Sequence, residues 1–338
     1  MKLVKILAKF IVTGLIGSFM LGGCKDRKVP DVSSLLQPVE IGRLDMELFR
    51  LDTLLPDVLV LKNKYGRYWD AYTAGVLNLG TVADSDFMNV FPLFIKDRVM
   101  REVADSVALA FPDMKDQEEE LSLAFAYYAY YFPGYLIPRV YTHISGFNQS
   151  VIVDSAIVGI GLDNYLGEHC IFYNMLAVPV PVYARKKMTG DDIVRDVLSG
   201  WICSEFPFRP VKNDLISGMI YQGKVAYLLE KLFPLRAVHW LLGFTPEQEK
   251  WCEDNESQIW GFLIENNYLF TTQQKVVMKY LNDAPYTSGM PLESPGKTVV
   301  WTGFQIVRKY MEKEPGGMEE LMKEQDYHKI LRVSGYRP

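Results

Sequence analysis

The start of the chain pairs basic residues with an apolar run, and this segment constrains the protein more than any other feature. Lys2, Lys5 and Lys9 precede an apolar stretch that covers residues 10–21. A basic start, an apolar segment and small residues after it are typical of a secretory signal peptide. The stretch is short for a membrane span, because a helix that crosses about 30 Å of hydrocarbon takes about 20 residues. We therefore expect the chain to be exported and its start to be removed.

The signal ends in Leu21-Gly22-Gly23-Cys24, which resembles the lipobox of bacterial lipoproteins. The resemblance implies cleavage before Cys24, a diacylglycerol on its thiol and a further acyl chain, such as palmitate, on its amine. Two or three acyl chains hold a protein firmly, since each buried methylene contributes roughly 0.8 kcal/mol. We expect a membrane-anchored lipoprotein of the cell envelope that is attached to the membrane through Cys24.

The mature chain is expected to begin with a tether. Residues 25–37 are charged, contain Pro30 and show no apolar period. The segment Lys25-Asp26-Arg27-Lys28 lacks an acidic run of the kind that surface export prefers, which favours a periplasm-facing domain. The predicted organisation is a lipoprotein signal peptide over 1–23, the lipidated cysteine and tether over 24–40, and a single envelope domain over 41–338.

Charge and cysteine content exclude some classes of protein. Removal of residues 1–23 takes away three lysines and changes the formal net charge from −5 to −8. A moderately acidic domain is no ligand for nucleic acid, so we expect no nucleic-acid partner. Cys170, Cys203 and Cys252 are left once Cys24 carries lipid, and no CxxC pair occurs. The fold therefore does not depend on a disulfide framework.

Helical periods dominate, and the predicted class is α+β, mainly helical, with a small mixed β-sheet. Residues 41–51 alternate in polarity and predict a strand, while 151–153 and 156–162 are suited to two strands or a hairpin. Gly218 and Gly223 predict close approach of another element to one helix. Helices are expected over 87–111, 116–132 and 191–206, after a cap at Asn213 or Asp214 and one at Thr245, and through residues 300–311.

The motifs of metal and nucleophile chemistry are missing. The histidines lie far apart in sequence and none belongs to an HExxH motif. Glu168 and His169 are ligand types, but adjacent residues do not converge on one metal. The sequence also contains no G-x-S-x-G elbow and no G-x-G-x-x-G loop. We therefore predict no metal site and no cofactor.

One loop matches the residue letters of two known motifs but lacks the structural context that each motif needs. Ser294 and Lys297 satisfy S-x-x-K, yet Pro295 and Gly296 between them are unsuited to the helix that this motif needs. Gly296-Lys297-Thr298 imitates the end of a phosphate-binding loop, but Pro291 stands where its first glycine belongs. A glycine bend and a cation before a helix can receive a carboxylate or phosphate. Ser294, Pro295, Gly296 and Lys297 are therefore a candidate interaction loop, and the alternative is a loop that only sets the helix angle.

Four stretches together carry a resemblance to a known family. They are VGIGLDNYLG at 158–167, IYQGKVAYLL at 220–229, WCEDNESQIWGFLIEN at 251–266 and ESPGKTVVWTGFQIVRKYM at 293–311. With the lipobox, they resemble the gliding-motility lipoprotein GldB family of Bacteroidota. The resemblance implies an association with the envelope machinery for surface gliding and its coupled secretion system, and protein partners within that machinery. It implies no established reaction.

A more distant similarity concerns zinc-peptidase-like domains, and it implies a zincin-like fold. In such domains one helix carries HExxH and a later helix supplies a glutamate near an E-G-x-A sequence. The predicted helix 191–206 takes the place of the first and contains no histidine. Gln222, in the sequence Gln222-Gly223-Lys224-Val225-Ala226, takes the place of that glutamate. Both ligand sets are thus missing, which implies a catalytically silent cleft.

These observations favour a lipid-anchored, non-enzymatic envelope component. One alternative is a hydrolase that acts on peptide or cell-wall material through an unrecognised site. Another is a glycan-binding lipoprotein, because the tyrosines of residues 127–141 have faces that stack on sugars. Helical spacing instead predicts that most of these tyrosines belong to the core.

Overall fold

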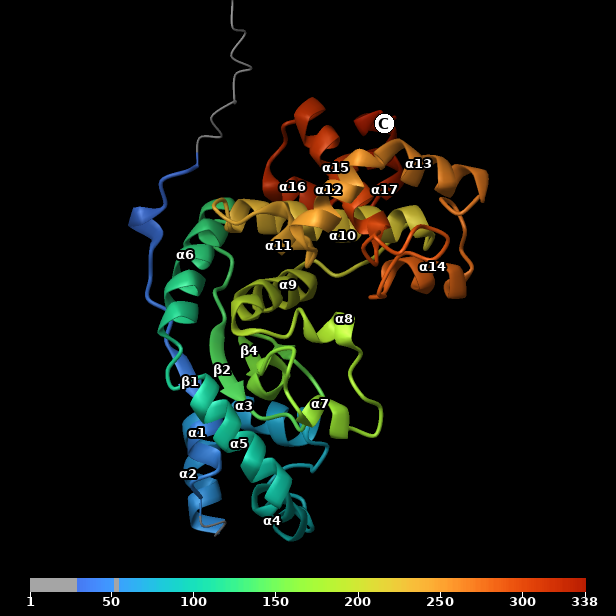
Figure 1. Ribbon diagram of the computed structural model, residues 1–338. Helices are drawn as coiled ribbons and strands as arrows, with labels where there is room; N and C mark the ends of the chain where they lie inside the picture. The colour runs from blue at the N-terminus through green and yellow to red at the C-terminus, as the bar shows by residue number, and fades with distance from the viewer. Residues whose placement is uncertain (1–28, 52–54) are drawn as a thin grey trace, which may run out of the picture. The chain divides into compact units, whose positions relative to one another are not determined.

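Helices form most of the protein, and one small sheet lies among them (Figure 1). The computed structural model describes residues 29–51 and 55–338, so the predicted signal peptide and Cys24 lie outside the described residues. Residues 31–338 form one compact unit. Among the described residues, no helix combines the length and the apolar character that a membrane span needs.

The sheet contains β1 (Ile41–Arg43), β2 (Arg139–His143), β3 (Val151–Asp154) and β4 (Ile157–Gly161). The longer helices are α2 (Leu55–Tyr65), α4 (Phe87–Lys96), α5 (Arg98–Ala110), α6 (Lys115–Tyr131), α9 (Ile193–Glu205), α10 (Leu215–Leu232), α12 (Pro246–Asp254), α13 (Glu256–Glu265), α14 (Gln274–Leu281), α15 (Thr298–Lys313) and α17 (Tyr327–Ser334). The shorter ones are α1 (Leu44–Leu48), α3 (Arg67–Asp70), α7 (Phe172–Met175), α8 (Val182–Arg185), α11 (Val238–Leu242), α16 (Met318–Lys323), η1 (Ser33–Leu35), η2 (Ala71–Val76), η3 (Leu162–Tyr165) and η4 (Gly190–Asp192).

The sheet is mixed and has the strand order β1-β2-β4-β3. β1 and β4 each run parallel to β2, with Ile41 opposite Val140, whereas β3 and β4 form an antiparallel hairpin. This hairpin is the one predicted from residues 151–162. The predicted fold class, α+β and mainly helical with a small mixed sheet, is confirmed. Its zincin-like character stays a prediction.

Successive residues of β4 face different parts of the core. Val158 and Ile160 belong to the large cluster that includes α9 and α10, while Ile157 belongs to a second cluster around α2, α3 and α4. Gly159 lies so close to Tyr68 that an added Cβ would stand 2.6 Å from its ring. The sheet is therefore covered on both faces, and α9 lies between it and α10 (Figure 1).

Helix α6 protects the edge of the sheet. The N–H groups of Val39 and Ile41 each donate to an α6 side chain, to Ser122 Oγ and Glu118 Oε1, both at 2.9 Å. Side-chain acceptors at an exposed strand prevent further pairing there. Val32 is also buried in the core cluster. The chain thus packs from Val32 onward, ahead of the boundary that the sequence predicts at residue 41.

Two predictions about the first third of the chain are wrong. The strand expected over 41–51 ends at Arg43, and α1 follows, because Leu44 and Leu48 are spaced for one helix face and both are fully buried. The single helix expected over 87–111 divides at Asp97. The Asp97 carboxylate accepts from the Met100 N–H at 2.9 Å and begins α5.

The tyrosine-rich segment is part helix and part strand. Tyr127 and Tyr128 on α6 are buried, as predicted. The helix ends at Tyr131, and β2 begins at Arg139 where sequence analysis expected no strand. Tyr141 on β2 stacks on Tyr68, with ring centroids 4.5 Å apart. Most of the tyrosine faces therefore meet other protein groups.

The closest helix crossing joins α10 to α15. A Cβ on Gly223 would lie 2.3 Å from the backbone carbon of Gly303, and one on Gly303 would lie 2.0 Å from Met219 O. A Cβ on Gly218 would lie 2.3 Å from the Leu281 side chain. The predicted close approach at Gly218 and Gly223 is confirmed, as are the Asp214 cap and the capping box of Thr245.

Candidate functional site

A polar cleft lies between α9 and α10 and is also lined by the segments around residues 283 and 297. Its volume is about 500 Å³. Proteins commonly bind small molecules in hollows of this size. The lining is Ser150, Asn164, Ala184, Lys187, Met188, Arg195, Asp196, Ser199, Cys203, Tyr221, Gln222, Val225, Ala226, Leu229, Leu241, Leu242, Gly243, Asp283, Lys297 and Val300.

Helix α9 presents a polar stripe to this cleft. Arg195, Ser199 and Cys203 follow one another at intervals of four residues, so they share one face of the helix. The opposite residues, such as Val197 and Trp201, are buried in the core. Sequence analysis treated this helix as an apolar element and missed the stripe. The i, i+4, i+8 spacing of polar residues was the signal that it overlooked.

Arg195 is held by two carboxylates. Its Nη1 lies 2.7 Å from Asp192 Oδ1 and its Nη2 lies 2.9 Å from Asp196 Oδ1. Nη1 also donates to the Trp240 carbonyl at 3.1 Å. Burial disfavours the guanidinium, but Asp196 and Asp192 outweigh it and raise the pKa of Arg195. This part of the cleft therefore carries a cation that is already neutralised.

The carboxyl of Asp196 is itself strongly desolvated. Burial raises its pKa, although Arg195 opposes that effect, and the Tyr165 hydroxyl donates to Asp196 Oδ2 at 3.1 Å. Asp192 stands on the other side of Arg195 and accepts from the Thr189 hydroxyl at 2.6 Å. Thr189 and Asp192 are thus joined through their side chains, and the Asp192 carboxylate pairs with Arg195 rather than with a backbone N–H group.

Two lysines of the cleft meet one carboxylate. Lys187 Nζ lies 2.9 Å from Asp283 Oδ1, and Lys297 Nζ lies 2.8 Å from the same oxygen. Burial lowers the pKa of Lys187, and the charge of Lys297 lowers it further. Burial tends to raise the pKa of Asp283, but Lys297 and Lys187 overcome this and hold it at about 2. The three groups, which we call the lysine pair with Asp283, carry a net positive charge.

The candidate interaction loop is fixed to the preceding segment. Ser294 is fully buried, with its hydroxyl accepting from the Thr287 N–H at 3.2 Å, and the Pro295 carbonyl accepts from the Thr287 hydroxyl at 2.7 Å. Gly296 lies against residue 284, where a Cβ would stand 2.1 Å from the carbonyl oxygen. Lys297 has φ of 62° and directs its ammonium to Asp283. Of the four residues, Lys297 is the one that lines the polar cleft.

Acidic and histidine side chains that could ligate zinc are dispersed in the structure. Asp163 is fully buried and accepts from the Ser145 and Phe147 N–H groups at 2.9 and 2.6 Å. His239 Nδ1 lies 3.0 Å from Glu249 Oε2, beside a neighbouring hollow of about 610 Å³. Over residues 29–51 and 55–338, no three His, Cys, Asp or Glu side chains gather in a way that would hold a metal ion.

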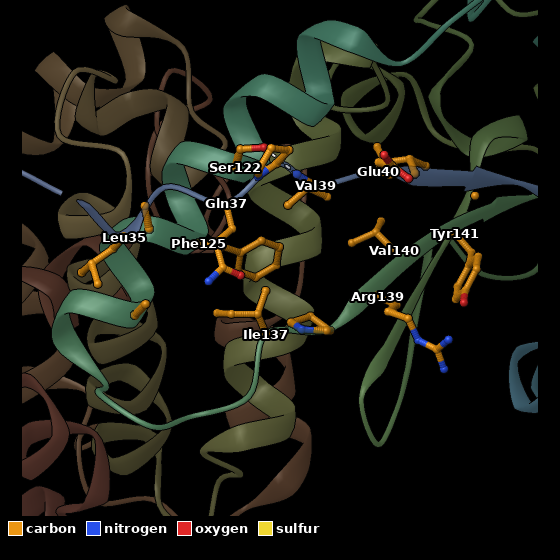
Figure 2. A pocket seen from close by; sticks show the side chains of 16 residues that line it. Leu35, Gln37, Val39, Glu40, Ser122, Phe125, Ile137, Arg139, Val140 and Tyr141 are labelled. Carbon is orange, nitrogen blue, oxygen red and sulfur yellow. Dashed lines mark hydrogen bonds between the residues drawn. The ribbon is translucent and has the colours of Figure 1, made fainter. Parts of the chain in front are cut away.

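A third hollow, of about 550 Å³, lies between the segment 35–42, β2 and α6. Figure 2 shows Phe125 and Ile137 facing one another inside it, with Arg139 and Tyr141 toward its far end. Pro38 and Pro138 stand where β1 and β2 would otherwise continue their pairing. This groove offers mainly apolar contact. The polar cleft is therefore the better candidate for specific recognition.

Comparison with known proteins gives one match. The family model described as gliding motility protein GldB matches residues 25–338. No curated protein and no solved structure matches the chain. The match contains the sheet, α9, α10 and every residue that lines the cleft.

Proposed function

Since the chain belongs to the family of gliding motility protein GldB, we propose that it is a lipid-anchored, non-enzymatic component of the envelope machinery for gliding or protein secretion. The family match carries this proposal because it covers the chain from residue 25 onward. The anchor and the absence of a reaction rest on further observations. The periplasm-facing orientation is supported by residues 25–28, which lack an acidic run.

The anchor rests on the sequence before residue 25. A basic start, an apolar run and Gly23-Cys24 support lipidation of the Cys24 thiol. A serine cannot replace this thiol as the acceptor of the diacylglycerol. Cys24→Ser should therefore abolish labelling by radioactive fatty acid and leave the precursor uncleaved. Labelling and membrane fractionation equal to those of the parent would show that the anchor is assigned wrongly.

The chemistry of the cleft supports a non-enzymatic role. The polar groups of α9 that line it are the paired guanidinium of Arg195, the carboxyl of Asp196 that pairs with it, a hydroxyl and a thiol, and α10 adds the neutral amide of Gln222. Burial raises the pKa of the Cys203 thiol, so this residue is not an activated nucleophile. The hydrolase alternative would need a nucleophile or a bound metal of a kind that this lining does not supply readily.

An exposed apolar loop supports a protein partner. From the residue before α7 to the first residue of α8, the side chains of Ile171, Met175, Val178 and Val182 are exposed, and that of Val178 is 83% exposed. Arg185 holds the loop from within, since it donates to the Val180 carbonyl at 2.7 Å and to Asn174 Oδ1 at 2.6 Å. A rigid loop that keeps several aliphatic side chains in water is typical of a contact surface.

A photo-crosslinking residue at position 178 in living cells tests the proposal. We expect a discrete adduct with a protein of the gliding or secretion machinery, identified by mass spectrometry. Leu235 is the matched control, because it is 88% exposed but lies outside this loop. A protein ladder that is the same from both positions, or an adduct with a protein of another process, would contradict the proposed function.

The glycan-binding alternative receives little support. Tyr127, Tyr128 and Tyr141 direct their rings toward other protein groups, and Tyr130 is the tyrosine of this segment that is mainly exposed. A single exposed ring is a poor sugar platform. Retention of the protein on immobilised soluble glycans would revive this alternative.

A further inference from the structure

One group of charges in the polar cleft holds more cations than anions. Lys187 and Lys297 both direct their ammonium groups to Asp283 Oδ1, at 2.9 and 2.8 Å. Each ammonium carries three N–H donors, so six donors converge near one carboxylate. Arg195, the other cation of the lining, is paired with two carboxylates of its own. Within the lysine pair with Asp283, two ammonium groups therefore share one carboxylate.

The rest of the lining indicates what else the ligand carries. Val225, Ala226 and Leu229 from α10 and Leu241 and Val300 from neighbouring helices give the cleft an apolar wall. Ser199 and Gln222 lie among them and offer a hydroxyl and an amide. A cation next to an aliphatic wall and two neutral hydrogen-bonding groups suits a carboxylate that is attached to a small apolar side chain and a peptide group.

We propose that the cleft binds the C-terminal carboxylate of a peptide whose last residue is small and aliphatic, with Lys187 and Lys297 as its counter-charges. A second carboxylate beside the two ammonium groups gives two anions to two cations and completes their neutralisation. The volume of about 500 Å³ accommodates the last one or two residues of a chain rather than a folded domain. This inference rests on the proposed function, because it specifies what a partner would place near the candidate loop.

The positions of the two lysines are themselves fixed. Lys297 follows the turn that contains the buried Ser294, and the side chains of Lys297 and Lys187 are only 22% and 27% exposed while both pair with Asp283. Side chains that are already ordered lose little conformational entropy when a ligand binds. The two ammonium groups are thus already ordered in the protein without a ligand.

Calorimetric titration of the mature lipoprotein in detergent at pH 7 tests the proposal directly. The probes are the peptide Gly-Gly-Ala-Val as the free acid, the same peptide with an amidated C-terminus, and inorganic phosphate. We expect the acid to bind at least about tenfold more tightly than the amide, which corresponds to roughly 1.4 kcal/mol. Equal affinities for acid and amide, no binding of the acid, or tighter binding of phosphate would each overturn the proposal.

Two variants with opposite expected effects separate binding from folding. Lys187→Met should weaken binding of the acid by about tenfold, whereas Asp283→Asn should strengthen it, because the ligand then no longer competes with a resident carboxylate. General loss of structure cannot strengthen binding. Lys186→Met is the matched control, since this neighbouring lysine is exposed and does not line the polar cleft. Weakening by Lys186→Met equal to that of Lys187→Met, or weakening by Asp283→Asn, would contradict the assignment.

These measurements also distinguish the inference from the proposed function. Failure of the free acid to bind removes the carboxylate site but leaves the crosslink at position 178 unaffected. Loss of the crosslink with retained binding of the acid removes the assignment to the gliding or secretion machinery and leaves the site in place.

Discussion

Helix α10 has one face that packs against another helix and one face that borders a cavity. One face crosses α15 at Gly223 and Gly303, where the two backbones touch and no Cβ has room. The other face lines the polar cleft with Gln222, Val225 and Ala226. Residues 222 and 223 are neighbours in sequence, yet one meets a cavity and the other meets a backbone. We infer that the first face serves stability and the second serves recognition, and each of the following changes tests one side of this contrast.

The largest expected effect comes from Gly223→Ala. Its Cβ would lie 2.3 Å from the Gly303 backbone, so α10 and α15 must separate. We expect a loss of about 3 kcal/mol in the free energy of unfolding, the upper range for overpacking. Denaturant unfolding measures this loss. Gly261→Ala in α13 is the control, because its Cβ meets nothing within 4 Å and alanine there should stabilise by about 1 kcal/mol. Equal effects of the two changes would remove the packing side of the contrast.

Lys224 gives the packed face a dependence on pH. The Lys224 ammonium is buried and donates to the carbonyls of Met322 at 3.0 Å and Glu324 at 2.7 Å. Burial lowers its pKa to about 7, although Glu324 opposes this effect. Between about pH 7 and 10.5 the unfolded chain therefore binds more protons than the folded protein, and stability rises with pH across this window.

Lys224 alone should raise the free energy of unfolding by about 2 kcal/mol between pH 7 and pH 9. The Lys224→Met variant should lack this rise. The measurement is the difference in unfolding free energy between variant and parent at the two pH values, which cancels the titration of other groups. A difference that does not change with pH would show that Lys224 keeps an ordinary pKa in the folded protein.

His143, at the end of β2, gives the core of the protein a second dependence on pH. It is fully buried, and its Nδ1 lies 2.7 Å from the Tyr68 hydroxyl. Burial lowers its pKa to about 3. Because the unfolded chain binds the proton more readily, stability falls as the pH drops from about 6.5 toward 3. Because of this single group, the free energy of unfolding is about 2 kcal/mol lower at pH 5 than at pH 7.5. His143→Gln should reduce the acid sensitivity by this amount, and an unchanged pH profile would show that His143 accepts a proton without unfolding.

The smallest expected effect on stability comes from the cleft face. Gln222→Ala removes a half-buried amide that borders the cavity, and we expect a change in unfolding free energy within about 0.5 kcal/mol. Binding of the free-acid peptide should weaken at the same time. A loss of stability similar to that of Gly223→Ala would mean that both faces of α10 are structural, and the contrast would then fail.

Lys297 gives a second test of the cleft lining. Its φ of 62° is a conformation that asparagine adopts readily, and its partner Asp283 would repel a new carboxylate. Lys297→Asn should therefore weaken peptide binding with a loss of stability below about 1 kcal/mol. Binding equal to that of the parent would return the loop to a purely structural role.

Local chemistry explains which parts of the fold were predictable. Asp214 and Thr245 each cap a helix by accepting a hydrogen bond from a residue three positions away, so the sequence contains both partners close together. Gly223 has no Cβ, and the sequence alone therefore shows that a backbone can approach it closely. The GldB resemblance was also readable from sequence, and the family match confirms it. The break at Asp97 was missed because apolar spacing continued across it and concealed the cap.

The cleft could not be predicted because its contacts are distant in sequence. Lys187 and Asp283 are separated by 96 residues, and Arg195 and the Trp240 carbonyl by 45. Such pairs depend on how α9, α10 and the segment around residue 283 come together in the folded protein. Sequence analysis identified Lys297 as a free cation before a helix, and the structure gives it a carboxylate partner.

Metal analysis of the purified mature protein tests the central claim that the cleft binds a ligand without catalysing a reaction. The protein is exposed to excess zinc, dialysed and analysed for bound metal, with Glu205→Gln and His169→Gln as companion variants. A catalytic zinc needs three protein ligands and a water, and in the part of the chain that the structure describes no three His, Cys, Asp or Glu side chains gather to hold a metal ion. We expect no retained zinc and no peptidase activity. One zinc per chain, lost on substitution of His169 or Glu205, would contradict the claim and favour the hydrolase.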